Sequence, residues 1–378
     1  MRRRAPILVL AVLPLLGLVA CGSDSDSDAT PDSGADTGAE VVAGQPMPSD
    51  RCDANKAAGT ITYLSSFDFA ATASIVEVLV AKQKGYFDEL CLDVDVKPGF
   101  SADNYPQLAA NKAQFSSGGS FSEVLDYAAA NQADFVTIAV EGKTGIDALI
   151  VKDGKAATLA DLRGSTIGVK GKITPSVAAM LLKSGLAEGK DYTTVLLDGF
   201  DPTVHIEVPN IVGFPGYKSN EPLQLEAKGI PFQLFDPADD DIPGSFGILY
   251  TNGTFLAEHP TAAQDFIRAA MRGLADAVAD PDAAAAIAVG FINANGNAMF
   301  LSPEGETARW GVESKLVTST NVNTALGVPE LDKLTDEVTT YAGIGLFGGK
   351  APDIAPFVHT DLIDGVYAAD KSVIWPKV

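Results

Sequence analysis

The chain has 378 residues, enough for two or three domains, and its 49 acidic and 27 basic side chains give a net charge of −22. A chain of this charge is repelled by phosphate backbones, which argues against nucleic-acid binding. Its three histidines, His205, His259 and His359, lie far apart and lack metal-ligand spacing. We therefore predict no metal, no cofactor and no catalytic residue.

The first 20 residues are typical of an export signal. Three arginines follow Met1, and the apolar stretch 7–18 is shorter than a membrane span and contains Pro14. The stretch ends in LVACG (18–22), which resembles the lipobox of bacterial lipoproteins and implies cleavage before Cys21 and acylation of that cysteine. We therefore expect an extracytoplasmic protein, anchored to the outer face of a bacterial cell membrane through a lipid on Cys21. The alternative is an ordinary signal peptide with a chance cysteine.

Residues 21–50 are predicted to form a disordered acidic tether. Between residues 22 and 50 there are seven acidic side chains and no basic ones, and Ser, Asp, Gly, Thr and Pro predominate. Such a segment has too little apolar surface to offset the entropy that it would lose on ordering. Beyond the tether, Cys52 and Cys91 form an even pair in an exported protein, which favours a disulfide over two free thiols.

Strand and helix patterns alternate from residue 60 onward. An alternating strand over 60–64 is followed by an apolar helix that ends at Gly85 and by a second alternating strand over 92–96. A strand–helix–strand unit implies a parallel sheet. Further strands are expected at 148–151, 166–169, 195–197, 211–214, 232–235 and 248–250, and mainly helices after 260. The pattern predicts an α/β fold with two sheet lobes.

Four sequence runs resemble motifs of the solute-binding proteins of ABC importers for nitrate, sulfonates, taurine and thiamine-pyrimidine precursors. The runs are AKQKGYFDE with LDVDV (81–96), AQFSSGGS (113–120), LADLRGSTIGV (159–169) and YKSNEP with a later KG (217–229). The family has a glycine where this chain has Cys91, a departure that supports a local disulfide. The resemblance covers about residues 60–300 and implies a type 2 periplasmic-binding-protein fold.

In that fold the ligand cleft lies between two parallel-rich sheets with flanking helices. We expect lobe 1 to comprise 51–155 and 250–378, and lobe 2 to comprise 156–249. The resemblance implies that a small molecule bound between the lobes closes them. The closed protein, expected to be a monomer, then delivers this molecule to an ABC permease and its ATPase.

Ligands of such α/β folds lie beyond the carboxyl ends of the strands. Aromatic rings there would stack on a planar ligand, while hydroxyls, backbone N–H groups and charged groups would hydrogen-bond to it. Each candidate also has a structural explanation, such as a core position for one phenylalanine or helix capping for Thr174 and Asn220. The candidate ligand-binding residues are Phe67, Asp68, Phe69, Ser117, Gly118, Lys172, Thr174, Tyr217, Asn220 and Glu221.

The charges in these loops suggest what the ligand is. Asp68 and Glu221 are matched only by Lys172 and Lys218, and no arginine is present to clamp a sulfonate or carboxylate. We therefore favour a neutral or weakly cationic nitrogen heterocycle, such as a thiamine-precursor pyrimidine, and a binding protein rather than an enzyme. The alternatives are an anion binder of the same family and a pyrimidine-synthase-like enzyme on the same fold.

Overall fold

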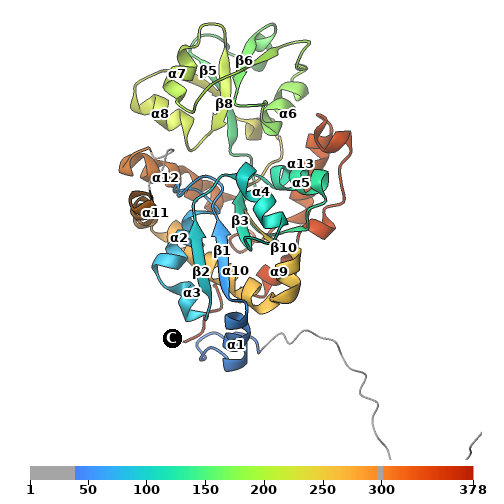
Figure 1. The fold of residues 1–378 in the computed structure, drawn as a ribbon. Coiled ribbons are helices and arrows are strands. Elements are labelled where there is room, and N and C mark those ends of the chain that lie inside the picture. The colour runs from blue at the N-terminus through green and yellow to red at the C-terminus, as the bar shows by residue number, and fades with distance from the viewer. Residues whose placement is uncertain (1–38, 296–300, 378) are drawn as a thin grey trace, which may run out of the picture. The chain divides into compact units, whose positions relative to one another are not determined.

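The computed structural model describes residues 39–295 and 301–377 (Figure 1). The predicted signal peptide, Cys21 and most of the predicted tether lie outside the described residues. The described part of the chain contains two five-stranded sheets. We call the sheet with strand order β2-β1-β3-β10-β4 and its helices lobe 1, and the sheet with order β7-β6-β8-β5-β9 and its helices lobe 2. The predicted α/β fold with two sheet lobes is therefore confirmed.

Lobe 1 is built on a mixed sheet. Strand β1 pairs in parallel with β2 and β3, and β10 returns antiparallel between β3 and β4. Its strands are β1 (Thr60–Leu64), β2 (Asp93–Lys97), β3 (Phe115–Gly118), β4 (Phe135–Gly142) and β10 (Phe246–Asn252). Its helices are α1 (Ser49–Ala57), α2 (Val76–Gln83), α3 (Tyr86–Glu89), α4 (Ser101–Ala109), α5 (Phe121–Asn131), α9 (Gly253–Glu258), α10 (Pro260–Ala279), α11 (Pro281–Asn295), α12 (Pro303–Thr320), α13 (Leu331–Ala342) and α14 (Thr360–Asp364).

Lobe 2 repeats this plan on a smaller scale. Strand β6 pairs in parallel with β7 and β8, and β5 lies antiparallel between β8 and β9. Its strands are β5 (Asp147–Lys152), β6 (Thr166–Val169), β7 (Thr193–Leu196), β8 (Gly213–Tyr217) and β9 (Phe232–Phe235). Its helices are α6 (Pro175–Lys183), α7 (Pro202–Glu207) and α8 (Glu221–Ala227).

The chain crosses between the lobes earlier than the sequence analysis predicted. The apolar strand expected at 148–151 is β5, and its pairing with β8 and β9 places it in lobe 2. The crossings therefore lie at 143–146 and 236–245, where the predicted boundaries were 155 and 250. The two crossing segments touch, because a Cβ on Gly244 would lie 2.8 Å from the Cα of Gly145. Glycine permits this close approach of the two backbones at the hinge.

Lobe 1 owes much of its core to the packing of α10 against α2. The apolar face of α10 points into this core, since Ile267, Met271 and Leu274 are fully buried. The two helices approach closely at Gly273, where a Cβ would lie 2.1 Å from the carbonyl oxygen of Glu77. This packing fixes α2, whose N-terminal loop forms part of the site described below.

The folded unit begins before residue 50, so the predicted tether is too long at its C-terminal end. Val41 is buried, and the backbone N–H of Gly44 donates to the carbonyl of Trp375 at 2.9 Å. The N–H of Lys377 donates in turn to the carbonyl of Gln45 at 2.7 Å. The C-terminal strand-like segment supplies the partners that composition alone did not reveal.

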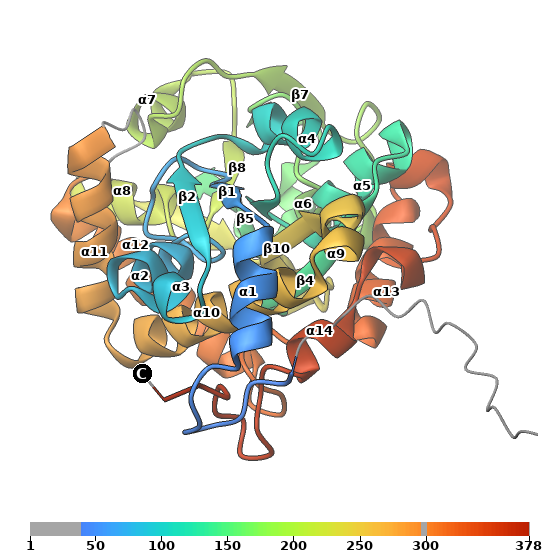
Figure 2. The same ribbon diagram turned by 60° about the horizontal axis from the view of Figure 1, so that its bottom comes forward.

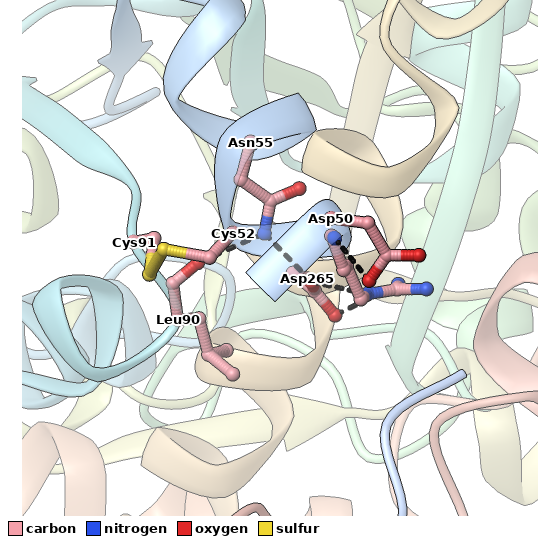
Figure 3. The surroundings of a disulfide bond; sticks show 7 residues. Asp50, Cys52, Asn55, Leu90, Cys91 and Asp265 are labelled. Carbon is pink, nitrogen blue, oxygen red and sulfur yellow. Dashed lines mark hydrogen bonds and ion pairs between the residues drawn. A yellow bond between two sulfur atoms is a disulfide. The ribbon is translucent and has the colours of Figure 1, made fainter. Parts of the chain in front are cut away.

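Helix α1 lies at the end of lobe 1 that is remote from lobe 2 (Figures 1 and 2). A covalent bond and buried charges attach it there. The expected disulfide between Cys52 and Cys91 is present, with the Cα atoms 5.3 Å apart (Figure 3). Beside it, Nε of Arg51 donates to Oδ2 of Asp265 at 2.6 Å, and Asn55 donates to the same oxygen at 2.8 Å.

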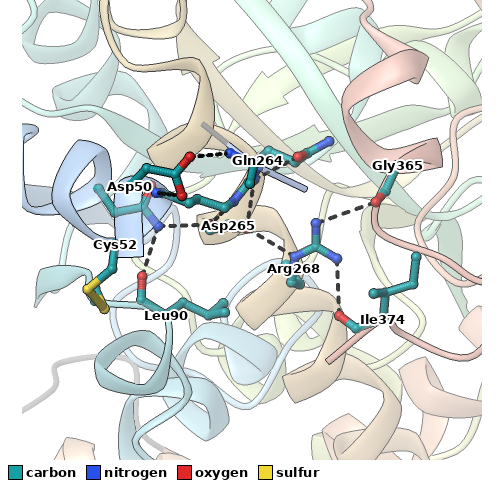
Figure 4. Close-up of polar contacts among 12 residues, drawn as sticks. Asp50, Cys52, Leu90, Gln264, Asp265, Arg268, Gly365 and Ile374 are labelled. Carbon is teal, nitrogen blue, oxygen red and sulfur yellow. Dashed lines mark hydrogen bonds and ion pairs between the residues drawn. A yellow bond between two sulfur atoms is a disulfide. The ribbon is translucent and has the colours of Figure 1, made fainter. Parts of the chain in front are cut away.

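The Asp265 carboxylate also organises the C-terminal segment (Figure 4). Nε of Arg268 donates to Oδ1 of Asp265 at 3.0 Å, and Nη1 of Arg268 donates to the carbonyl of Ile374 at 3.0 Å. The N-terminal helix and the C-terminal segment are thus connected through one buried carboxylate.

None of the helices in the described ranges is both long enough and apolar enough to cross a membrane.

Candidate functional site

A divided cleft lies where the loops of the two lobes face each other. It consists of three neighbouring hollows of about 100, 260 and 230 Å³. Tyr217 of lobe 2 lines all three hollows, whereas Phe67 and Glu123 of lobe 1 each line two. Because neighbouring hollows share lining residues from both lobes, we treat them as one inter-lobe cleft.

Most of the predicted ligand contacts are brought together in this cleft. They follow strands β1, β3, β6 and β8, whose carboxyl ends point toward the other lobe. The predicted residues that line it are Phe67, Gly118, Lys172, Thr174, Tyr217, Asn220 and Glu221.

Three predicted contacts lie elsewhere. Phe69 is fully buried in the core of lobe 1, with its ring 5.6 Å from that of Phe291. Ser117 is also fully buried, and its hydroxyl accepts from the backbone N–H of Ser66 at 2.6 Å. Asp68 has a left-handed backbone with a φ of 55°, and it does not line the cleft. The structure places these three residues outside the walls of the cleft, and their contact with a ligand stays a prediction.

Glu221 is already engaged within lobe 2. Its Oε1 accepts from Nζ of Lys170 at 2.7 Å, and its Oε2 accepts from the backbone N–H of Tyr217 at 2.8 Å. The carboxylate therefore fixes the loop that carries the Tyr217 ring into the cleft. Lys170, which was not predicted, lines two hollows and lies 5.3 Å from the centre of the Phe200 ring.

Thr174 has a hydroxyl without a partner. It occupies the predicted N-cap position of α6, with Pro175 following, but its side chain makes no capping hydrogen bond. Its Oγ1 is buried and has no hydrogen-bond partner among the described residues. Because a buried hydroxyl without a partner is unfavourable, this group is available to a ligand.

Three carboxyl groups line the 260 Å³ hollow: Glu123 and Asp126 come from lobe 1, and Asp147 comes from lobe 2. Asp147, at the start of β5, accepts from the hydroxyl of Ser176 at 3.0 Å, and burial raises its pKa to about 7. Burial also raises the pKa of Glu123 in α5. Neither Glu123 nor Asp147 was among the predicted ligand contacts. The hydroxyl of Ser120 accepts from the Glu123 N–H at 3.3 Å. At neutral pH this wall can both donate and accept hydrogen bonds.

An arginine reaches the cleft from a distant part of the sequence. Arg309 of α12 lines the 100 Å³ hollow, and its Nη2 donates to Oδ1 of Asn220 in lobe 2 at 2.8 Å. Its Nη1 is paired with Glu306 at 2.7 Å. The four ligand loops contain no arginine themselves, but the fold brings Arg309 of α12 to them. This arginine is neutralised by its own helix, so it does not form an open anion clamp.

In the loop before α2, the backbone N–H groups donate hydrogen bonds to carboxylates of the same chain. The N–H of Ala71 donates to Glu306 at 2.9 Å, and the N–H of Ala73 donates to Glu313 at 2.6 Å. The N–H of Ser74 donates to Glu141 at 3.1 Å. A helix N-terminus is a ready site for anions, and here it is already filled.

The remaining walls of the cleft are aromatic. Phe67 comes from lobe 1, and Phe200 and Tyr217 come from lobe 2. Phe200 is 56% exposed and Tyr217 is 40% exposed, which are high values for aromatic side chains. No cluster of three or more His, Cys, Asp or Glu side chains suited to a metal ion occurs within residues 39–295 and 301–377.

Comparisons with known proteins agree with this architecture. The 34%-identical riboflavin-binding protein RibY of Chloroflexus aurantiacus aligns over 139 residues, which are 36% of this chain and 39% of that protein. The aliphatic sulphonate binding protein SsuA of Escherichia coli superimposes with a TM-score of 0.60 at 12% identity, over 79% of this chain and 92% of its own. The nitrate-binding protein NrtA of Synechocystis gives a TM-score of 0.58 at 14% identity, over 82% and 90%.

Two sheets joined at a hinge, with a lined cleft between them, define the periplasmic-binding-protein fold. Residues 72–284 match the family model described as NMT1/THI5 like. The chain belongs to this family.

Proposed function

We propose that this protein is an extracytoplasmic solute-binding protein whose ligand is a planar nitrogen heterocycle without a net negative charge. The main support for the proposal is the set of side chains that line the cleft. Three aromatic rings, two carboxyl groups with raised pKa values and an unpartnered hydroxyl converge there. Rings stack on planar groups, and the carboxyl groups and the hydroxyl match ring nitrogens and amino groups.

Lobe closure would couple binding to conformation. Phe67 and Glu123 come from lobe 1, whereas Thr174 and Tyr217 come from lobe 2. A ligand that contacts both sets binds the closed form better than the open form, and it therefore shifts the population toward closure. The glycine contact at Gly145 and Gly244 lies on the two crossing segments that such a motion would bend.

The ligand class is tested by thermal unfolding of the purified protein in the presence of riboflavin, an aminopyrimidine, taurine, methanesulfonate or nitrate. A ligand with a micromolar Kd that is added at millimolar concentration stabilises the folded state by about 4 kcal/mol, so we expect a clear rise in Tm for a heterocycle. Tyr217→Ala should lower that affinity at least tenfold, whereas Tyr217→Phe keeps the ring and should retain most of it. A rise in Tm with the anions alone would contradict the proposal.

We also propose that Cys21 carries a lipid and that the loaded protein docks on an ABC permease and its ATPase. The LVACG run supports the lipid anchor. Delivery to a permease is supported by the fold shared with the ligand-binding component of an ABC-type import system from Staphylococcus aureus. Cys21→Ser should abolish incorporation of labelled palmitate and move the protein from the membrane fraction to the soluble fraction. Palmitate labelling of the Cys21→Ser variant would contradict this assignment.

The second candidate function is binding of an anion, favoured by the folds shared with the sulphonate and nitrate binders. The occupied donors of residues 71–74 speak against it, because an added anion would compete with carboxylates of the chain itself. An enzyme on this fold remains the third candidate, and product formation from a bound pyrimidine would establish it.

A further inference from the structure

The carboxylate of Glu313 accepts hydrogen bonds from a set of donors that could equally bind a free oxyanion. Its Oε2 accepts from the Ala73 N–H and from the Thr72 hydroxyl, both at 2.6 Å. Its Oε1 accepts from the hydroxyl of Ser219 in lobe 2, also at 2.6 Å. Three donors from two lobes thus converge on one carboxylate, which lies in the wall of the 100 Å³ hollow.

The guanidinium of Arg309, which is also paired with Glu306, acts on the same carboxylate. Burial raises the pKa of Glu313, and the Arg309 guanidinium, one turn earlier in α12 and in the wall of the same hollow, partly offsets this rise. Nε of Arg309 is buried and has no partner among the described residues. Convergent donors and an adjacent guanidinium are what proteins use to bind sulfonate, nitrate or carboxylate groups.

Capping of α2 does not account for this arrangement by itself. Glu306 and Glu141 already accept from the N–H groups of Ala71 and Ser74 on either side. A cap would also not require a bond to Ser219 in the other lobe. Glu313 therefore accepts hydrogen bonds from both lobes across the cleft, and its role is not limited to capping one end of a helix.

We propose that Glu313 is a specificity-determining residue: its carboxylate is a built-in anion that fills the anion subsite of the cleft and so excludes anionic solutes. This inference rests on the proposed function and deepens it, because it states why the ligand carries no negative charge. The tethered carboxylate also joins the lobes through Ser219, in the hollow that Thr174 does not line. The remaining volume is left to the heterocycle.

The test is to remove the carboxylate and to ask whether an inorganic anion takes its place. Glu313→Ala frees the donors of Thr72, Ala73 and Ser219, and we expect it to bind nitrate or methanesulfonate at least tenfold more tightly than the wild type. Glu304→Ala is the matched control, because Glu304 is an exposed acid of the same helix and its removal changes the net charge equally. Calorimetric titration at constant ionic strength measures both.

Further variants keep the test decisive. If Glu313→Ala folds poorly, Glu313→Ser leaves the same space and should also gain anion binding. Ser219→Ala retains the carboxylate and should gain none. The inference is overturned if neither Glu313 variant gains affinity, or if the wild type binds the anion as tightly as they do. Heterocycle binding by the wild type, measured in the same samples, reports on the proposed function separately.

Discussion

Asp265→Ala is expected to lower the free energy of unfolding by about 3–5 kcal/mol, because it leaves buried charges without a counterion. Arg51 and Arg268 are 3% and 2% exposed, and both donate to this carboxylate. Asn55 loses a partner in the same change. The substitution therefore removes the one carboxylate that α1 shares with Arg268, the residue that donates to the C-terminal segment.

Urea denaturation of the wild type and the variant measures this loss. Asp95→Ala is the matched control, since Asp95 pairs with Lys97 at 3.0 Å in the same lobe, but both side chains are about half exposed. Exposed pairs contribute about 0–1 kcal/mol, so the control should unfold near the wild-type midpoint. Equal effects of the two substitutions would show that the Asp265 network is not a stabilising element.

Stability should fall as the pH rises from about 5 to about 8, and the buried pair Glu77 and Glu141 should account for part of this fall. Both side chains are fully buried, and the two oxygens of Glu77 have no donor from other residues in the described part of the chain. Burial raises the pKa of Glu77 to about 8 and that of Glu141 well above its usual value. The nearby Glu313 carboxylate raises both further.

The direction of this pH dependence follows from the number of protons that the folded and unfolded states bind. In the unfolded chain Glu77 loses its proton near 4.5, whereas in the folded protein it keeps the proton until about pH 8. Between these values the folded state holds one more proton, so the free energy of unfolding falls by roughly 1.4 kcal/mol per pH unit for that proton. Its stabilising contribution is fully present below about pH 4.5 and is lost above about pH 8.

Glu77→Gln replaces the buried ionisable group with an amide that stays neutral at every pH. We expect this variant to show a flatter dependence of stability on pH and to be at least as stable as the wild type at pH 8. The difference between the two pH profiles isolates the pair from Asp147, whose pKa is also raised. Parallel profiles would contradict the assignment.

The local patterns predicted the two sheets, the disulfide and most of the cleft. The strand at 148–151 was expected, but its lobe was not, because periodicity shows that a strand is buried without showing which sheet it joins. The same limit applies to Phe69, since an aromatic residue in a ligand loop has the same pattern whether it faces the core or the cleft.

Other features of the site depend on contacts between distant segments. Arg309 and Glu313 lie about 240 residues from the loop that they contact, as the Thr72–Glu313 separation of 241 shows. No spacing rule connects these segments. The charge count for the ligand loops therefore omitted the two side chains that decide whether an anion fits.

The most direct test of this account is calorimetric titration of the purified protein with an aminopyrimidine and with riboflavin, in parallel with nitrate and methanesulfonate at the same ionic strength. The account predicts binding of a heterocycle with a negative heat-capacity change, as expected for burial of a planar apolar ring, and no measurable binding of either anion. Binding of nitrate or methanesulfonate by the wild type, without binding of a heterocycle, would contradict it.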